Sequence, residues 1–161
     1  MSAARACSCV SGGGSEKQKI AAAYRQGALI FVGQVVSVET VVTTDTVRVS
    51  DTGPIEQRTR LIKHETLRYT FAVSRQLKGQ LSGSTVLIST ETQSSSCGKQ
   101  FKIGSEQLVY AFLVSQEASL LGGEPKSVAP YYATSLCERN QELKYVKAAE
   151  LRQLNQLGKA G

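Results

Sequence analysis

The sequence contains no tryptophan, a single histidine and only four cysteines among its 161 residues. One histidine excludes chemistry that needs two imidazoles, such as a zinc centre of the H-E-x-x-H type. No apolar run approaches the roughly 18 residues that indicate a transmembrane helix, so we expect no membrane span. A G-x-S-x-G elbow is missing, and Gly12-Gly13-Gly14 is not followed by the Gly-Lys-Ser/Thr of a P-loop. These absences argue against an enzyme, and no motif indicates a cofactor.

The composition otherwise describes one folded domain. Hydrophobic residues make up 41% of the chain and charged residues 20%, which provides enough apolar material for a packed core. A length of 161 residues fits one domain of ordinary size, and we expect a monomer. Nineteen basic residues against 13 acidic ones give a net charge of +6. This moderate surplus favours acidic partners without defining a function.

The four cysteines are Cys7, Cys9, Cys97 and Cys137. Of their three pairings, a bridge between Cys7 and Cys9 is too short to form comfortably, and the other two both tie the N-terminus to distant parts of the chain. Structural zinc sites carry C-x₂₋₄-C knuckles, whereas Cys97 and Cys137 each stand alone, and no C-x-x-C redox motif is present. Disulfides are therefore favoured over free buried thiols and over zinc. Because disulfides persist in oxidising compartments, we expect an exported protein, extracellular or periplasmic.

An exported chain is expected to carry a signal peptide, yet residues 1–6 lack the apolar segment of one. However, Ala4-Arg5-Ala6 has the small-x-small form of a cleavage site directly before Cys7. One hypothesis takes residues 1–6 as the remnant of a leader or an added extension, and residues 7–161 as a single mature domain. The alternative is a chance match, which an alanine-rich hexamer readily gives.

A short helix is predicted at each end of the chain. Ser15, with Gln18 three residues later, forms a capping box, which predicts a helix that starts there and ends at Gly27. Near the C-terminus apolar residues recur at helical spacing, and Gly158 is expected to lie beyond the end of that helix. The residues that set this spacing are Val146, Ala149, Leu151, Leu154 and Leu157.

Five segments between the helices have strand character: residues 29–42, 67–73, 85–89, 107–114 and 131–136. The first contains Gly33 as a bulge or bend, and the fourth is apolar enough to be buried on both faces. The first two segments and the turn at residues 51–54 predict one long hairpin that projects beyond the core. Helix, five strands and helix, without βαβ alternation, predict a mainly β domain: a five-stranded OB-fold β-barrel with a short N-terminal helix and a C-terminal helix.

A series of short motifs follows along the chain: Cys7-Ser8-Cys9-Val10, residues 28–35, Tyr69-Thr70-Phe71, Leu77-Lys78-Gly79, residues 94–98, Val109-Tyr110-Ala111 and Thr134-Ser135-Leu136-Cys137. In this order they resemble the tissue inhibitors of metalloproteinases, whose inhibitory domain has the netrin-like OB fold. The similarity covers roughly residues 7–137 and the helix beyond. The compact pattern looks most like the single-domain relatives of bacteria and invertebrates.

The resemblance implies disulfides Cys7–Cys97 and Cys9–Cys137, although the third bridge of the family's inhibitory domain is missing. In that family the first residue chelates the protease's catalytic zinc through its α-amine and carbonyl oxygen. Here that residue is Cys7, so inhibition is expected only once residues 1–6, which turn the amine into an amide, are removed. The implied protease-binding ridge comprises Cys7, Ser8, Cys9, Val10, Ser95 and Ser96, with Ser8 entering the S1′ pocket.

A second hypothesis is a netrin-like binding module without inhibitory activity, which recognises a polyanion or an extracellular protein. Its candidate contacts are the basic residues on one arm of the predicted hairpin, where Arg58 and Arg60 are expected to share a strand face. The alternative is a solvated hairpin whose charges protect its edge from pairing. The basic residues are Arg58, Arg60, Lys63 and Arg68, with His64 among them.

Nucleic acid is not an expected partner. OB-type barrels that bind single strands present exposed aromatic residues interleaved with cations. In this sequence Tyr69, Phe71, Tyr110 and Phe112 lie at positions that alternate into the predicted core. An exported location also separates the protein from such a substrate.

Overall fold

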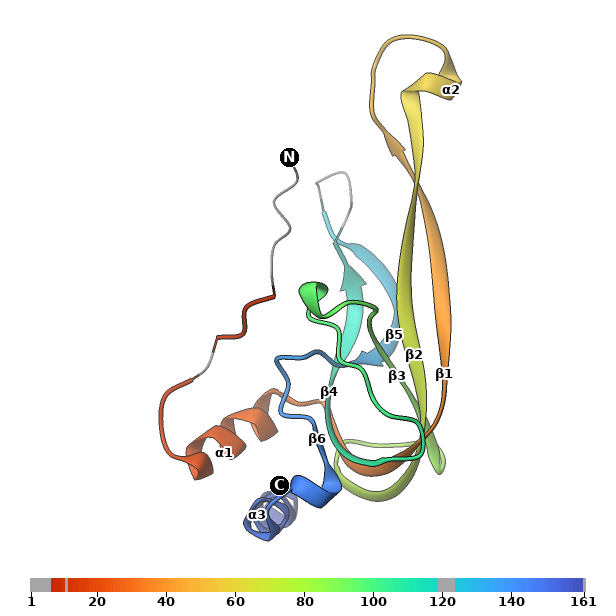
Figure 1. The fold of residues 1–161 in the computed structure, drawn as a ribbon. Helices are drawn as coiled ribbons and strands as arrows, with labels where there is room; N and C mark the ends of the chain where they lie inside the picture. The colour runs from red at the N-terminus through yellow and green to blue at the C-terminus, as the bar shows by residue number, and fades with distance from the viewer. Residues whose placement is uncertain (1–6, 11, 119–123, 161) are drawn as a thin grey trace.

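The computed structural model describes residues 7–10, 12–118 and 124–160, with a long hairpin projecting from one end and two helices packed at the other (Figure 1). Residues 1–6, on which the leader hypothesis depends, lie outside the described part. None of the helices that the structure describes is long and apolar enough to cross a membrane.

The first helix, α1 (Glu16–Gln26), begins at the predicted capping box. The backbone N–H of Gln18 donates to the Ser15 hydroxyl oxygen (3.3 Å), and the Ser15 N–H donates to the Gln18 side-chain oxygen (2.9 Å). These two bonds satisfy N–H groups that have no partner within the helix. The helix ends where predicted, with the Gly27 N–H bonded to the carbonyl of Ala23.

Strands β1 (Leu29–Arg48) and β2 (Thr59–Lys78) form the projecting hairpin, joined through the helical turn α2 (Ile55–Arg58). Both strands run further than predicted, because the threonine-rich outer residues still pair across the hairpin. Neighbouring strands cover only the base: β4 pairs with residues 29–34 of β1, and β3 pairs with residues 66–72 of β2. The outer half of the hairpin therefore has no other strand beside it in the described part of the chain (Figure 1).

The remaining strands are β3 (Thr85–Glu91), β4 (Glu106–Glu117), β5 (Lys126–Ala133) and the two-residue β6 (Gln141–Glu142). Their order is β1-β2-β3-β5-β4-β6, and the extra β1–β4 pairing closes the first five strands into a ring. The predicted mainly β class is thus confirmed. β5 ends three residues earlier than predicted, because the chain leaves the sheet after Ala133. There the Leu136 N–H donates to the Cys97 carbonyl (2.8 Å) instead of to a neighbouring strand.

Two hydrophobic clusters form the core, one on each side of β1 and β4. Inside the closed sheet, four aromatic side chains pack mainly edge to face, with distances of 5.1–6.3 Å between their centroids. They are Phe31, Tyr69, Phe71 and Phe101. The second cluster packs the helices onto the ring and contains Ile20, Ile30, Val32, Leu77, Leu108, Tyr110 and Leu154. A register shift between Val32 and Gly33 confirms the predicted bulge.

Burial of β4 differs from the prediction in its second half. Residues 107–111 are buried in succession, because alternate side chains enter the two clusters. Beyond them Phe112 is only half-buried and Leu113 is exposed, so the strand is not buried on both faces throughout. Tyr69, Phe71 and Tyr110 are buried as expected.

The C-terminal helix, α3 (Ala148–Ala160), follows the short helical turn η2 (Leu143–Tyr145). Val146 precedes the helix and Gly158 lies within it, so the predicted boundary at Gly158 is wrong. A Cβ atom at Gly158 would lie 3.1 Å from the carbonyl oxygen of Leu77. Glycine is therefore used here for close packing of α3 on β2, and its cost of about 1 kcal/mol in a helix is tolerated.

Candidate functional site

Residues 7–10 form a segment without regular secondary structure that two disulfides fasten to the rest of the fold. Cys7 is bonded to Cys97 and Cys9 to Cys137, which is the pairing that the resemblance implies. The bridges span sequence separations of 90 and 128 residues. Closing loops of this length stabilises a fold by about 4–5 kcal/mol each in the chain-entropy model. The two bridges therefore hold this segment in place at two of its four residues.

The sulfur atoms of Cys7, Cys97 and Cys137 all lie within 4.8 Å of one another. Such a group resembles part of a metal site in its spacing. However, none of the four cysteines is free, and a disulfide sulfur is not the thiolate that binds zinc. The closeness of the sulfurs comes from two adjacent bridges, of which Cys9–Cys137 is the more exposed.

Exposure changes along the anchored segment. Cys7 is half-buried, Ser8 and Cys9 are exposed, and Val10 is 99% exposed. An apolar side chain presented in this way offers area that a partner can bury. Because Cys7 and Cys9 are covalently fixed, little conformational entropy remains to be lost when a partner binds.

The second segment of the site is the helical turn η1 (Ser94–Ser96), which leads directly into Cys97. Ser95 and Ser96 are exposed beside the Cys7–Cys97 bridge. The turn is closed by hydrogen bonds from the N–H groups of Ser96 and Gly98 to the carbonyl of Gln93 (3.0 and 2.9 Å). We call residues 7–10 with Ser95 and Ser96 the ridge. The Cys7–Cys97 bridge places Ser95 and Ser96 beside Cys7, while Cys9 is fastened separately to Cys137.

Cys97 itself adopts a left-handed backbone conformation, with φ of 63°. The next residue, Gly98, is buried so closely that a Cβ atom there would overlap the carbonyl oxygen of Glu91. Beyond it the Lys99 N–H donates to the hydroxyl of Thr90 (2.8 Å). These contacts fix the loop that carries Cys97 against the end of β3, so that the ridge rests on a rigid base.

The Cys137 side is held by a buried polar network that sequence reasoning missed. Glu150 of α3 is 5% exposed and accepts hydrogen bonds from Arg139 Nε (2.8 Å) and from the hydroxyl of Tyr110 (2.9 Å). Arg139 also bonds Glu16 of α1 (2.8 Å). Asn140 accepts from the Tyr110 N–H (2.8 Å) and so ties the same segment to β4. The network fastens the chain just after Cys137 to both helices and to the sheet.

The charges of this network follow from its contacts. Hydrogen bonding to Glu150 raises the pKa of Arg139, and burial raises the pKa of the Tyr110 hydroxyl. The hydrogen bond from Arg139 lowers the pKa of Glu16. Arg139 is therefore the permanent cation between two carboxylates. The only sequence signal for it was its place two residues after a cysteine, which is too weak to find it.

The basic residues of the hairpin are less regular than predicted. Arg58 lies in α2, where its Nε donates to the carbonyl of Gly53, and β2 begins only at Thr59. The expectation that Arg58 and Arg60 share a strand face is therefore wrong. The physical reason is that the chain after Pro54 forms a helical turn, closed by a hydrogen bond from the Gln57 N–H to the Pro54 carbonyl (2.9 Å).

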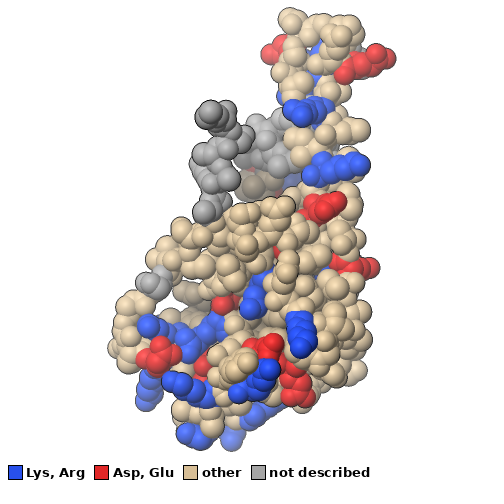
Figure 2. All heavy atoms as spheres, viewed as in Figure 1, with Lys and Arg blue, Asp and Glu red and all other residues tan. Residues whose placement is uncertain are grey.

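Side chains alternate along β2, so that Arg60 and Arg68 face one side of the hairpin and Lys63 the other. Arg68 is paired with Glu39 across the hairpin (3.4 Å), and His64 lies 3.4 Å from Glu91. Both acidic and basic side chains lie along the projecting part of the molecule (Figure 2). The hairpin cations therefore do not form one continuous basic patch.

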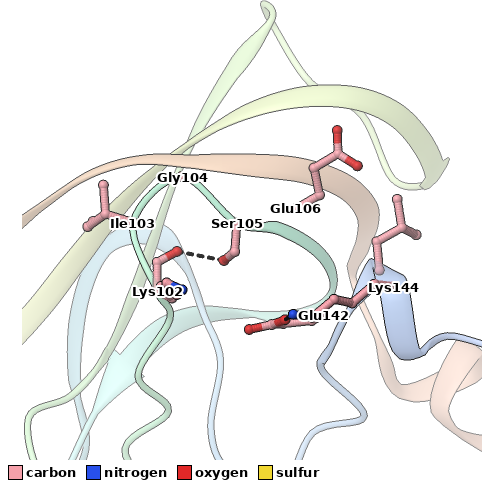
Figure 3. Close-up of a pocket in the computed structure, with 8 residues that line it drawn as sticks. Lys102, Ile103, Gly104, Ser105, Glu106, Glu142 and Lys144 are labelled. Carbon is pink, nitrogen blue, oxygen red and sulfur yellow. Dashed lines mark hydrogen bonds and ion pairs between the residues drawn. The ribbon is translucent and has the colours of Figure 1, made fainter.

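A shallow hollow of about 570 Å³ lies between the loop before β4 and the segment at β6 and η2 (Figure 3). Its charged residues include Lys102, Glu106, Glu142 and Lys144, of which Lys144 is paired with Glu142 (3.3 Å). The Ser105 hydroxyl donates to the Lys102 carbonyl (2.6 Å) and is thus used within the loop. None of the lining residues belongs to the ridge, and the arrangement offers no activated nucleophile.

No protein-family model matches the chain, and no curated protein is similar to it at a significant level.

Proposed function

We propose that this protein inhibits a zinc metalloendopeptidase, using the ridge as the part that enters the active-site cleft. The observation that carries the proposal is the double anchoring of the exposed segment 7–10 by the bridges Cys7–Cys97 and Cys9–Cys137. We also infer that the closed ring of five strands is the netrin-like OB-fold barrel of the inhibitors that the motifs resemble. The mainly β architecture and the flanking helices support this inference.

Zinc chelation by Cys7 is the proposed mechanism. A catalytic zinc of a protease keeps one coordination position open for the water that attacks the peptide bond. The α-amine of Cys7 and its carbonyl oxygen form a five-membered chelate with that zinc and displace the water. An α-amine has a pKa of about 8, so a useful neutral fraction exists at pH 7. Ser8 then enters the S1′ pocket, and Cys9 and Val10 occupy the sites beyond it.

Preorganisation supports high affinity for this mode. The chelating residue is half-buried and covalently fixed to the η1 loop, so the amine and carbonyl do not search for their geometry. Ser95 and Ser96 lie on the same loop and provide the second line of contact. The exposed side chain of Val10 supplies apolar area at the edge of the chelate.

The proposal requires a free amine on Cys7. With residues 1–6 attached, the nitrogen of Cys7 is an amide, which is a poor zinc ligand, and the additional residues collide with the cleft. We therefore propose that the inhibitory form begins at Cys7, in an exported protein that acts in the extracellular or periplasmic space. The two disulfides are consistent with such a compartment.

The test is to compare three oxidised, refolded forms against a panel of zinc endopeptidases. The forms are the chain beginning at Cys7, the same chain with its α-amine acetylated, and the 161-residue chain. We expect nanomolar inhibition by the first alone. Acetylation is the matched control, because it removes the zinc ligand and leaves the disulfides and Ser8 unchanged. Equal, weak inhibition by all three would exclude chelation by Cys7.

A further inference from the structure

One edge of β4 has a gap between the end of β5 and the start of β6. Tyr110 of β4 lies at this gap, because the residues two positions to either side of it pair with β5 and with β6. Between these two strands, residues 134–140 leave the sheet as a loop (Figure 1). We call residues 134–140 the anchor loop, because they include Cys137, which holds the second disulfide of the ridge.

Two side chains of the anchor loop take the place of a strand at this gap. The N–H of Tyr110 donates to the Asn140 side-chain oxygen (2.8 Å), and the carbonyl of Tyr110 accepts from the Thr134 hydroxyl (2.8 Å). The Asn140 side chain also donates to the Thr134 hydroxyl oxygen (2.7 Å) and to the Ser135 carbonyl (3.2 Å). Both ends of the anchor loop are thus bonded to the backbone of one residue and to each other. We call Thr134 and Asn140 the clamp.

The polar groups of the clamp are satisfied in a largely buried place. Thr134 is 3% exposed and Tyr110 is 1% exposed. The side-chain oxygen of Asn140 accepts one hydrogen bond and its amino group donates two, so each of its N–H groups has an acceptor. A buried polar group that loses its partner is costly, whereas a fully bonded network favours one geometry. The anchor loop therefore has little freedom where it joins the sheet.

The anchor loop also contacts the loop that carries the other disulfide. The Leu136 N–H donates to the Cys97 carbonyl (2.8 Å). Cys97 holds Cys7, the first residue of the ridge, while the anchor loop holds Cys9. This bond therefore joins the attachment points of the two bridges. A shift of the anchor loop would move Cys9 relative to Cys7.

We propose that Thr134 and Asn140 are positioning residues of the ridge, which set the place of Cys9 relative to Cys7. Neither residue belongs to the ridge, and both act through the anchor loop and its disulfide. Arg139 fastens the loop to the helices only after Cys137, whereas the clamp holds it on both sides. Groups that must align at one reaction centre lose much of their effect when displaced by about 1 Å. The consequence for inhibition rests on the proposed function, but the placement of the anchor loop does not.

The test separates the hydroxyl of Thr134 from its shape. Thr134→Val keeps nearly the same shape and removes the hydroxyl, whereas Thr134→Ser keeps the hydroxyl. Amide hydrogen exchange of Leu136 in the 161-residue chain reports how firmly the anchor loop is held. Inhibition constants of the chain that begins at Cys7 report the geometry of the ridge. We expect about tenfold or greater faster exchange and weaker inhibition for the Val variant, and changes below about threefold for the Ser variant.

Val86→Ala is the control, because it removes buried apolar atoms at the start of β3, outside the anchor loop and the ridge. It should lower the midpoint of thermal unfolding and leave Leu136 exchange and inhibition unchanged. If Thr134→Val lowers the midpoint but also leaves both readouts unchanged, Thr134 is a merely structural residue and the proposal is overturned. Loss of both readouts in the Ser variant would overturn it too, since the hydroxyl would then not be what positions the loop.

The exchange measurement needs no protease. If no form of the chain inhibits a protease, the proposed function fails, and the exchange of Leu136 still decides whether the clamp holds the anchor loop. Asn140→Asp serves as the second variant if Thr134→Val does not fold. It keeps the acceptor for the Tyr110 N–H and removes both donors, so it should show the same faster exchange. Exchange equal to that of the unchanged protein would contradict the proposal.

Discussion

The sulfur atoms of Cys7 and Cys137 belong to different disulfides and lie 3.8 Å apart. They are in van der Waals contact, so a thiolate on Cys137 would be next to a disulfide that it can attack. Thiol–disulfide exchange proceeds through such an attack, in which one sulfur displaces another. The two bridges that hold the ridge are thus chemically coupled as well as adjacent.

Replacing Cys9 with Ser tests this coupling. The change frees Cys137, whose thiolate attacks the sulfur of Cys7, forms Cys7–Cys137 and releases the thiolate of Cys97. We expect a mixture of the two bridged forms, enriched in exchange at pH 8.5, where more thiolate is present. Alkylation followed by peptide mass mapping measures the fraction of free Cys97. In the matched variant Cys137→Ser, the free Cys9 lies outside the group of three sulfurs, and the Cys7–Cys97 bridge should persist.

Arg139→Ala is expected to destabilise the fold strongly. It leaves the carboxylate of Glu150, which is 5% exposed, without its cation, and it also breaks the bond to Glu16. Removing one partner of a buried ion pair costs about 3–5 kcal/mol of unfolding free energy. Urea unfolding with both disulfides intact measures the loss.

The exposed pair between Lys144 and Glu142 supplies the control for that prediction. Lys144→Ala should leave the unfolding free energy nearly unchanged, since ion pairs of exposed lysines contribute little to stability. Similar small losses for Arg139→Ala and Lys144→Ala would show that the buried network does not hold the Cys137 segment.

Local signals were sufficient to predict the elements that depend on neighbouring residues. The capping box at Ser15 and the turn signal of the hairpin act within a few residues, and the structure has both. By contrast, the bonds of Glu150 to Arg139 and Tyr110 join three separate elements. In sequence Glu150 looks like any polar residue of an amphipathic helix. Its burial depends on how α3 docks, which no local pattern encodes.

The same limit explains the errors in the prediction. Glycine usually stops helices, which predicts a helix end at Gly158, whereas its place opposite the Leu77 carbonyl requires a residue without a side chain. The basic residues of the hairpin looked like one cluster because the acidic partner of Arg68, Glu39, lies far away in sequence and adjacent only across the sheet. The disulfide pairing was predictable because the motif resemblance implies which cysteines join, and the structure has the same two bridges.

Glu138, next to Cys137, is expected to make stability depend on pH. Burial raises its pKa, and a hydrogen bond with Ser135 only partly offsets this. A carboxyl group whose pKa is raised by folding stabilises the folded state in its protonated form. This contribution to stability is fully present below the ordinary pKa and is lost as the pH rises through the pKa of the folded state. Relative to the unchanged protein, Glu138→Gln should therefore raise the unfolding free energy more at pH 7 than at pH 4. Urea unfolding at both pH values measures this, and a difference of opposite sign would contradict it.

Ser8 is expected to set which proteases are inhibited by the chain that begins at Cys7. The residue is exposed, so its replacement should leave the thermal stability unchanged. Ser8→Gly removes contacts in the S1′ pocket and should weaken inhibition several-fold, while Ser8→Arg should shift inhibition toward proteases with deep or acidic pockets. Inhibition constants over a protease panel report the change. Ser82→Gly, at another exposed serine, is the control and should leave the pattern as it is.

Gly98→Ala tests whether the loop that carries Cys97 needs its close packing. A methyl group at this position overlaps the carbonyl oxygen of Glu91, and because the obstacle is backbone, no side-chain rotation relieves it. Overpacking of this kind costs about 1–3 kcal/mol and moves the backbone. The matched change Gly83→Ala meets nothing within 4 Å and should be neutral or slightly stabilising, by up to about 1 kcal/mol. Because Gly98 adjoins Cys97, the first variant should lose protease inhibition as well as stability, whereas the second should lose neither. Equal unfolding free energies for the two variants would show that the loop adapts, and rigidity of the ridge would then have to come from the disulfides alone.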